Sequence, residues 1–306
     1  MKQIMLLTVI VILVPFLVIT ILVKNNTLLF SYDTNKQDMV RIKRETTGQI
    51  DTVPFEEYVK GVLAGEVPTS FHIEALKAQA VAARSYAMKK IEDNTATDYD
   101  VVDTVSNQVY MDDAQLKEKW KDQYDEKMKI IESAVNETKG EYLEYDGKVA
   151  QAFFFSTSAG KTENSEEVFQ SALPYLRSVD SSWDQEVSPV FQQDYQFSVH
   201  DFYQKLGLPY KETVQFQVTK QTSTGRVKEV NIDGTVLKAS DISSKLGLRS
   251  TFFTFEQIGS NIHMTTKGYG HGVGMSQYGA QAMALKGSTY DQILKHYYQG
   301  VQIKKK

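Results

Sequence analysis

The sequence predicts an α+β fold in which an N-terminal transmembrane helix precedes one mixed domain of helices and antiparallel strands. Three observations support this prediction: an apolar stretch at the N-terminus, helical periodicity over residues 54–138, and strand-like alternation over much of the later chain. Helices and strands are therefore mostly segregated along the sequence. No break in composition requires a second domain.

The N-terminal apolar stretch runs from Ile4 to Val23 and is interrupted only by Thr8 and Thr20. About 20 apolar residues are enough for a helix to cross a hydrocarbon core of roughly 30 Å. A cleaved signal peptide would have a shorter apolar region followed by a small-x-small cleavage site, and residues 22–26 contain no such site. We therefore expect an uncleaved, single-pass anchor in the cell membrane.

The predicted organisation has three parts. Residues 1–24 form the transmembrane anchor, residues 25–38 a polar spacer, and residues 39–306 the domain that carries the chemistry. A short tail before a first span usually stays inside the cell, so we expect residues 39–306 to be extracytoplasmic.

Composition excludes several classes of function. The 306 residues carry a formal net charge of -4, which gives no electrostatic support for a nucleic-acid partner. The chain has no cysteine, which rules out disulfides, thiolate metal sites and a cysteine nucleophile.

The first half of the domain is predicted to be mainly helical. Pro54 opens a helix that ends before Pro68, and Thr69 or Ser70 caps an alanine-rich helix that runs to about Asp93. The alanines lie on several faces of that helix, so we expect it to be buried. The other expected helices are 113–138, 199–206, 240–246, 276–286 and 290–298.

The expected strands alternate in hydrophobicity and are separated by turn residues. Asp146-Gly147 and Asp233-Gly234 are typical of type I′ hairpin turns. The expected strands are 39–43 with 48–53, 141–145 with 148–155, 214–219, 227–232, 251–258 and 262–266.

Three segments have the residue types that chemistry needs. The first is Leu63–Pro68, in which Glu66 is a single carboxylate between apolar residues at a helix end. Packing against Leu63, Val67 or Phe71 would raise its pKa, as a general acid near neutral pH requires. The alternative is a helix-end glutamate exposed to water.

The second segment is a strongly apolar strand that runs into a hydroxyl-rich loop containing Ser156, Ser158 and Lys161. Such a loop suits the recognition of sugar hydroxyls. Ser158 and Lys161 also fit the S-x-x-K pair of serine acyl-transfer enzymes, but the Ser-Asp-Asn and Lys-Thr-Gly partner motifs are absent. A polar turn without function is the third reading.

The third segment is Gly268–Ala280, in which glycines alternate with tyrosine, histidine and valine. Glycines at this density allow the backbone to approach another group closely. Ser276 can cap the following helix, whereas His271 alone is a poor metal site. A purely structural glycine turn stays open as the alternative.

Four motifs in this order resemble the stage II sporulation protein D family. They are Leu63–Pro68, Ala75–Ala87, Ser156–Thr162 and Gly270–Ala280, and the likeness spans about Val53 to Gln302. The resemblance implies a peptidoglycan lytic transglycosylase that cleaves MurNAc-GlcNAc bonds of glycan strands stripped of stem peptides and leaves 1,6-anhydroMurNAc ends. It also implies work during sporulation engulfment beside a membrane-bound amidase and a further membrane partner of the engulfment machinery.

The same resemblance suggests roles for individual residues. Glu66 matches the catalytic glutamate of the family, and Arg84 matches a functionally important arginine on the following helix. The expected substrate-binding residues are Arg84, Ser156, Ser158, Lys161, His271, Ser276, Gln277 and Tyr278. Some members carry a Cys/His zinc site after the arginine-containing helix. This chain has no cysteine and no histidine between His72 and His200, so we expect no metal and no cofactor.

Two other functions remain open at this stage. One is a non-catalytic glycan-binding protein that activates a cell-wall amidase through the same groove. The other is a serine acyl-transfer enzyme built on Ser158 and Lys161.

Overall fold

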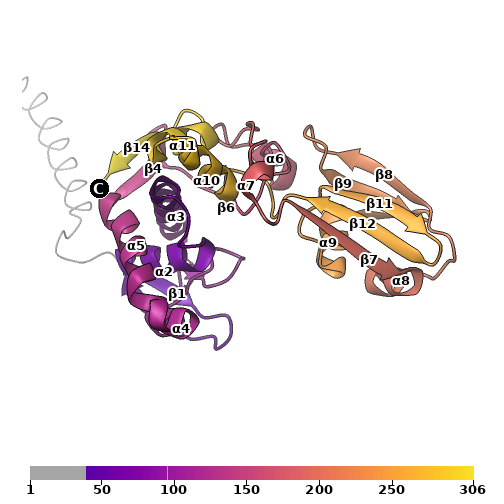
Figure 1. Ribbon diagram of the computed structural model, residues 1–306, viewed down its shortest axis with the longest axis horizontal. Coiled ribbons are helices and arrows are strands. Elements are labelled where there is room, and N and C mark those ends of the chain that lie inside the picture. Colours follow the sequence, from indigo (N-terminus) through magenta and orange to yellow (C-terminus); the bar gives the residue numbers. More distant parts are fainter. Residues whose placement is uncertain (1–38, 95) are drawn as a thin grey trace, which may run out of the picture. The chain divides into compact units, whose positions relative to one another are not determined.

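The computed structural model describes residues 39–94 and 96–306, and Val40–Lys306 forms one compact unit (Figure 1). The predicted anchor and spacer lie outside the described residues. Among the helices within the described ranges, none is both long and apolar enough to cross a membrane. The predicted mixture of helices and antiparallel sheets is confirmed for this part of the chain.

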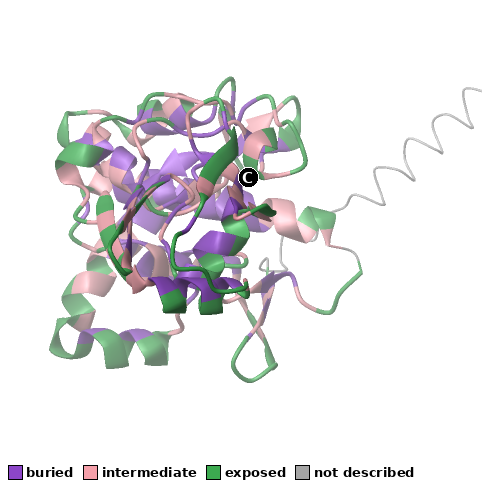
Figure 2. Cartoon of the chain, turned by 90° about the vertical axis from the view of Figure 1, so that its right-hand side faces the viewer, coloured by how far each residue is buried: buried purple, intermediate pink, exposed green. Residues whose placement is uncertain are grey.

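The described residues bury two hydrophobic cores rather than one. The first gathers residues from Val40 to Leu176 and again from Val273 to Val301, whereas the second is enclosed by a single stretch from Val199 to Met264. Both stretches have an ordinary globular composition, so no shift in sequence marks their boundary. Figure 2 shows the buried residues gathered at the centre of the view and the exposed residues around it.

The alanine-rich helix α3 (Ile73–Asp93) organises the first core. It contacts α2 (Phe55–Glu66), α5 (Tyr124–Glu137), α10 (Gln277–Leu285) and α11 (Tyr290–Tyr297). Its alanines are buried on several sides, as predicted, because small side chains let four helices approach one axis.

Three helix boundaries differ from the prediction. Pro54 is the N-terminal cap of α2 rather than its first residue, and His72 caps α3 in place of Thr69 or Ser70. The Nδ1 atom of His72 accepts a hydrogen bond from the backbone N–H of Glu74 (3.2 Å). The predicted helix 113–138 is interrupted, because Lys121 has a φ of 50° that no α-helix accommodates.

That interruption divides the segment into α4 (Asp113–Trp120), a 3₁₀ turn (Lys121–Gln123) and α5. Further along the chain are the short helices α6 (Ser165–Val168) and α7 (Asp184–Val187). Helices α8 (Val199–Leu206) and α9 (Ala239–Leu246) pack on the second core, close to their predicted bounds.

The first core carries two three-stranded sheets. Strand β1 (Met39–Lys43) lies between β2 (Ile50–Pro54) and β3 (Val101–Val102), with β1 and β3 parallel. Strand β4 (Glu141–Tyr145) lies between β5 (Lys148–Val149) and β14 (Gln302–Lys305). The hairpin turn between β4 and β5 has positive φ angles at Asp146 and Gly147, as the type I′ prediction requires.

The predicted strand 148–155 is also broken. Strand β6 (Phe154–Phe155) leaves the hairpin and pairs in parallel with β13 (Met275–Ser276), so the pairing is not antiparallel throughout. The second core carries the sheets β10-β9-β8 and β11-β12-β7. Their strands are β7 (Gln192–Ser198), β8 (Phe216–Gln221), β9 (Val227–Ile232), β10 (Thr235–Lys238), β11 (Phe253–Ile258) and β12 (Asn261–Lys267).

Candidate functional site

Glu66 is the last residue of α2, and the chain becomes extended at Val67 before Pro68. One carboxylate oxygen of Glu66 accepts a hydrogen bond from the backbone N–H of Val109 (2.6 Å). The other oxygen accepts one from the side-chain amide of Gln277 (3.4 Å). Segments 43 and 211 residues away along the chain therefore hold this one side chain.

Burial raises the pKa of the Glu66 carboxyl above its ordinary value, as the sequence predicted. The hydrogen bonds from Val109 and Gln277 oppose this effect, because both favour the charged form. The outcome is a carboxylic acid that stays protonated to higher pH than a solvated glutamate and still has two donors ready for its carboxylate. Those properties suit a group that both gives and takes a proton.

The Val109 contact depends on glycines in α2. A Cβ atom at Gly65 would lie 2.6 Å from the carbonyl oxygen of Val109, and one at Gly61 would lie 2.4 Å from the ring of Tyr110. The two glycines are four residues apart and therefore share one face of the helix. Residues 109–111 pack directly on that face, and this close approach brings the Val109 N–H to Glu66.

Two amide side chains anchor the segment before Val109. Gln108 is fully buried, accepts a hydrogen bond from the Tyr58 hydroxyl (2.9 Å) and donates to the Ala83 carbonyl (3.4 Å). The Asn107 amide donates to the Tyr86 hydroxyl (3.2 Å). Sequence reasoning missed this segment, although glycines four residues apart in a helix were a signal of close packing.

The hydroxyl loop and the glycine-rich loop lie side by side because β6 pairs with β13. The backbone N–H of Tyr278 donates to the Ser156 carbonyl (3.0 Å). A Cβ atom at Gly274 would lie 2.0 Å from the Phe153 carbonyl oxygen, so no other residue fits there. The β6–β13 pairing positions Gln277, the first residue of α10, so that its side-chain amide donates a hydrogen bond to Glu66.

Ser276 caps α10 as predicted, since its hydroxyl accepts a hydrogen bond from the Gly279 N–H (3.2 Å). The same hydroxyl donates to Asp184, which also accepts hydrogen bonds from the Ser158 N–H (2.6 Å) and the Ser181 hydroxyl (2.7 Å). Burial raises the pKa of Asp184 to about 6. Ser158 and Ser276 are both fully buried, so they support the loops rather than face solvent.

Ser158 and Lys161 do not form a nucleophile–base pair. The Ser158 hydroxyl is buried and accepts a hydrogen bond from the Gly160 N–H (3.0 Å), whereas Lys161 is exposed. A serine acyl-transfer enzyme needs the base within hydrogen-bond reach of the hydroxyl. The geometry therefore contradicts the acyl-transfer alternative.

His271 is a structural residue of the glycine-rich loop. Its Nδ1 atom accepts a hydrogen bond from the Val273 N–H (3.0 Å), and its ring packs against Phe153, Phe155 and Phe169. Burial and the positive charge of Arg226 lower the pKa of His271 to about 4. The imidazole is therefore neutral at physiological pH and holds the loop.

Arg84, a predicted substrate-binding residue, is buried and paired within the protein. Its side chain is 1% exposed and donates to both oxygens of Glu56 (3.0 and 2.8 Å) and to the Glu141 carbonyl (2.9 Å). Arg84 thus joins α2, α3 and β4 through three of its five N–H groups.

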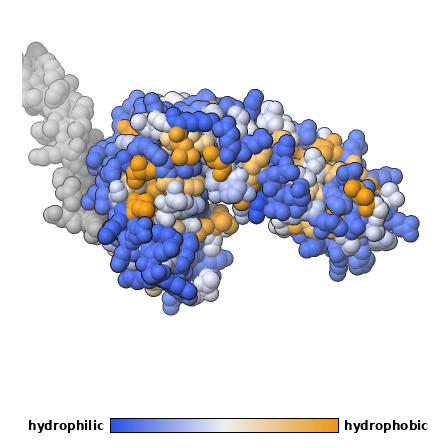
Figure 3. Space-filling view, viewed as in Figure 1, coloured by the Kyte–Doolittle hydropathy of each residue, from blue (hydrophilic) through white to orange (hydrophobic). Residues whose placement is uncertain are grey.

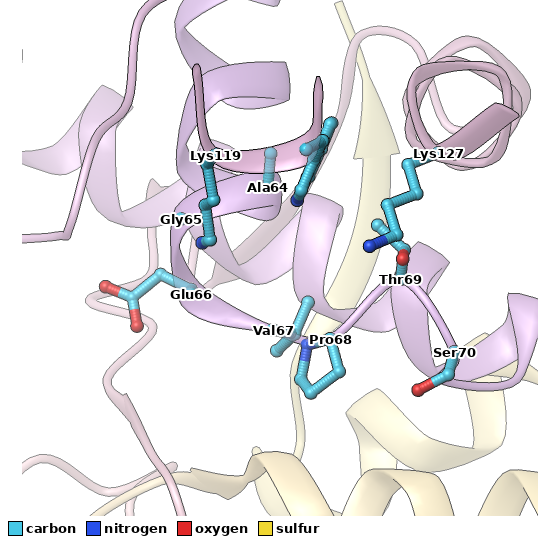
Figure 4. Close-up of a pocket in the computed structure, with 10 residues that line it drawn as sticks. Ala64, Gly65, Glu66, Val67, Pro68, Thr69, Ser70, Lys119 and Lys127 are labelled. Carbon is cyan, nitrogen blue, oxygen red and sulfur yellow. The ribbon is translucent and has the colours of Figure 1, made fainter. Parts of the chain in front are cut away.

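A pocket of about 580 Å³ opens beside Glu66. Its wall is formed by the end of α2, the turn that follows it, and the facing ends of α4 and α5 (Figure 4). Figure 4 shows the Glu66 carboxylate at one side of this pocket, turned away from Val67 and Pro68. The lining residues are Ala64, Gly65, Glu66, Val67, Pro68, Thr69, Ser70, Lys119, Trp120 and Lys127.

Of the predicted substrate-binding residues, Gln277 contacts Glu66 directly. Tyr278 is half-buried, and its ring packs edge-to-face on Phe71 with 5.1 Å between the ring centroids. Ser156 is half-buried in the adjoining loop. Among the residues that the structure describes, no group of three or more His, Asp or Glu side chains is arranged to hold a metal ion.

The sequence is similar to proteins of known families over most of its length. The model of the family described as Stage II sporulation protein (SpoIID) matches residues 43–145, which include Glu66 and Val109. The chain is 46% identical over 270 residues to stage II sporulation protein D of Bacillus amyloliquefaciens, covering 86% of this chain and 78% of that protein. It is 44% identical over 269 residues to stage II sporulation protein D of Bacillus subtilis (strain 168), with the same coverage. It is also 30% identical over 299 residues to the amidase enhancer of Bacillus subtilis, covering 80% of this chain and 40% of that protein.

Proposed function

Because the chain belongs to the stage II sporulation protein D family, we propose that it is a peptidoglycan lytic transglycosylase of sporulation engulfment. Its proposed substrate is the MurNAc-GlcNAc bond of glycan strands stripped of stem peptides. One observation carries this proposal: Glu66 has a raised pKa beside an open pocket in which no other lining residue of the described chain bears a carboxylate.

The proposed reaction uses Glu66 twice. The protonated carboxyl donates its proton to the glycosidic oxygen as the bond to MurNAc C1 breaks and an oxocarbenium-like state develops. The carboxylate then accepts the proton of the C6 hydroxyl of the same sugar, and that oxygen attacks C1. The product is a 1,6-anhydroMurNAc end, and no water is consumed. Because the nucleophile belongs to the substrate, a second protein carboxylate is unnecessary.

The two donors to Glu66 support the second half of this cycle. Val109 and Gln277 stabilise the carboxylate that forms when the proton leaves, and they fix its direction. Neither donor depends on bound substrate, so the acid is oriented before the glycan arrives.

The test is product analysis with purified peptide-stripped glycan. Glu66→Gln keeps the shape of the side chain but cannot donate the proton, so turnover should fall by about 10²–10⁴-fold or more. Glu57→Gln, on an exposed position of the same helix, is the matched control and should keep its activity. The wild-type products should carry anhydro ends, which mass spectrometry separates from hydrolysed ends by one water. Hydrolysed ends, or full activity in Glu66→Gln, would refute the assignment.

A second candidate function is a non-catalytic glycan-binding activator of a cell-wall amidase. The observation that favours it is the 30% identity to a protein named amidase enhancer. This candidate predicts that purified protein binds peptide-stripped strands without cleaving them, and that amidase turnover rises when it is added. Glu66→Gln would then stimulate the amidase as well as the wild type does.

We further propose that residues 1–24 anchor the protein in the cell membrane with residues 39–306 outside, beside a membrane-bound amidase and a further membrane partner of the engulfment machinery. The support for the anchor is the apolar stretch from Ile4 to Val23. Protease added to intact protoplasts should remove the ectodomain. Recovery of soluble protein beginning near residue 25 would contradict the anchor.

A further inference from the structure

Two lysine side chains line the Glu66 pocket without an acidic partner. Lys119 contacts the Met111 sulfur (3.5 Å), and the Lys127 ammonium lies 5.9 Å from the centre of the Trp120 ring. Neither lysine forms an ion pair with any residue of 39–94 or 96–306. The neighbouring Lys117, by contrast, pairs with Asp113 at 2.7 Å.

The break between α4 and α5 brings these lysines to the same pocket. In an unbroken helix, residues 119 and 127 would lie about 12 Å apart along the axis. The positive φ at Lys121 instead turns the chain, and Figure 4 shows the Lys119 ammonium beside the Gly65–Glu66 end of α2 and the Lys127 ammonium beside Thr69. The surface over α4 and α5 is otherwise hydrophilic, with charges of both signs (Figure 3).

The pocket is therefore electrostatically suited to an anion. It contains two uncompensated positive charges, and its single acidic side chain is Glu66, whose raised pKa favours the neutral form. Trp120 lines the same pocket, is 7% exposed and has its ring centre 5.9 Å from the Lys127 ammonium. Thr69 and Ser70 add hydroxyl groups to the lining of the pocket. Cations, an aromatic face and hydroxyls together fit an acidic sugar.

We propose that Lys119 and Lys127 bind the lactyl carboxylate of the MurNAc residue whose bond is cleaved, and that they thereby select strands without stem peptides. This inference rests on the proposed function. The lactyl group is attached at C3 of the sugar whose C1 reacts, so its carboxylate lies close to the acid during the reaction. A stem peptide converts that carboxylate into a neutral amide, which cannot form the ion pairs. Arg84, which the family resemblance suggested as a substrate-binding residue, is already paired with Glu56.

The experiment measures binding in a Glu66→Gln background, so that turnover plays no part. Isothermal titration would compare peptide-stripped glycan with the same glycan after its lactyl carboxylates have been converted to methylamides. The test variant is Lys119→Gln/Lys127→Gln. The matched control is Lys129→Gln/Lys139→Gln, which removes the same charge from two exposed positions outside the pocket. Thermal unfolding of each variant verifies that it is folded.

With both lysines present, the free carboxylate should bind up to about tenfold more tightly than the amide, as one exposed and one half-exposed ion pair would give. The test variant should lose this preference and the control should keep it. The preference should also shrink at high salt. Equal affinity for carboxylate and amide, or an unchanged preference in the test variant, would overturn the proposal.

A third ligand, glycan with intact stem peptides, identifies the source of the carboxylate. It should bind like the methylamide, although its peptides carry carboxylates of their own. Tight, lysine-dependent binding of this ligand would show that the pocket recognises the peptide and would overturn the proposal. Failure of the wild type to cleave any glycan would contradict the proposed reaction, whereas the binding measurement would still test the role of the two lysines.

Discussion

Replacing Gly65 by alanine tests whether close packing of residues 109–111 on α2 sets the chemistry of Glu66. Alanine is the better helix former, by up to about 1 kcal/mol, so propensity alone predicts a more stable protein. The structure predicts the opposite. The new Cβ atom would lie 2.6 Å from the Val109 carbonyl oxygen, where ordinary contact begins near 3.4 Å.

The overlap involves a backbone atom, so it cannot be relieved by rotating a flexible side chain. Forcing the segment away should cost about 1–3 kcal/mol, which exceeds the propensity gain. We therefore expect Gly65→Ala to lower the free energy of unfolding by about 1–2 kcal/mol, or several degrees in melting temperature. Thermal and urea unfolding would measure this change.

The displacement should also reach the carboxyl group. The Val109 N–H favours the charged form of Glu66, so a weaker contact should raise the pKa of Glu66 further. The ¹³C resonance of the Glu66 carboxyl, followed against pH, reports that pKa without reference to activity, and the signal is absent in Glu66→Gln. A Gly65→Ala protein that is more stable than wild type and titrates unchanged would refute the reasoning.

Three further outcomes follow from the same contacts. Gln277→Leu removes a donor that favours the charged form of Glu66, so the pKa should rise and the alkaline limb of the pH–rate profile should move to higher pH; an unmoved limb would speak against the contact. Arg226→Met leaves the buried Glu163 without its cation and should cost about 3–5 kcal/mol of stability, whereas a loss below about 1 kcal/mol would contradict this. Asp184 has a folded pKa of about 6 against an ordinary 3.8, so its stabilising contribution is complete below pH 4 and is lost as the pH rises to 6. Unfolding measured across that window should show about 3 kcal/mol of pH dependence that is absent in Asp184→Asn.

Local sequence signals predicted most of the helices and strands of the described chain. Helix 199–206 and strand 227–232 have their predicted bounds, because apolar periodicity and glycine or Asp-Gly boundaries act within a few residues. The errors fall where tertiary contacts override such signals. Strand β7 (Gln192–Ser198) was missed because its polar sequence becomes a strand by pairing with β12.

The residues of the candidate site likewise fall into those that local sequence signals indicated and those that only tertiary contacts bring together. The sequence singled out Glu66 as a candidate, because apolar neighbours at a helix end can desolvate a carboxylate and because the family resemblance matches it to a catalytic glutamate. The sequence also placed Ser276 at a helix cap. The family resemblance suggested that Arg84 binds substrate, and no local pattern reveals that Glu56 lies beside it. The sequence did not predict that Asp184 and residues 107–111 belong to the site, because their hydrogen-bond partners lie far away along the chain.

The sequence by itself therefore determined the class of fold, the family likeness and the candidate acid. The tertiary structure decided what surrounds that acid: the Val109 N–H admitted by two glycines, the amide of Gln277 delivered by the β6–β13 pairing, and two lysines turned toward one pocket by the break at Lys121. The physical reason is that propensity and periodicity are properties of neighbouring residues. A pKa, by contrast, depends on every group within a few ångströms, whatever its distance along the chain.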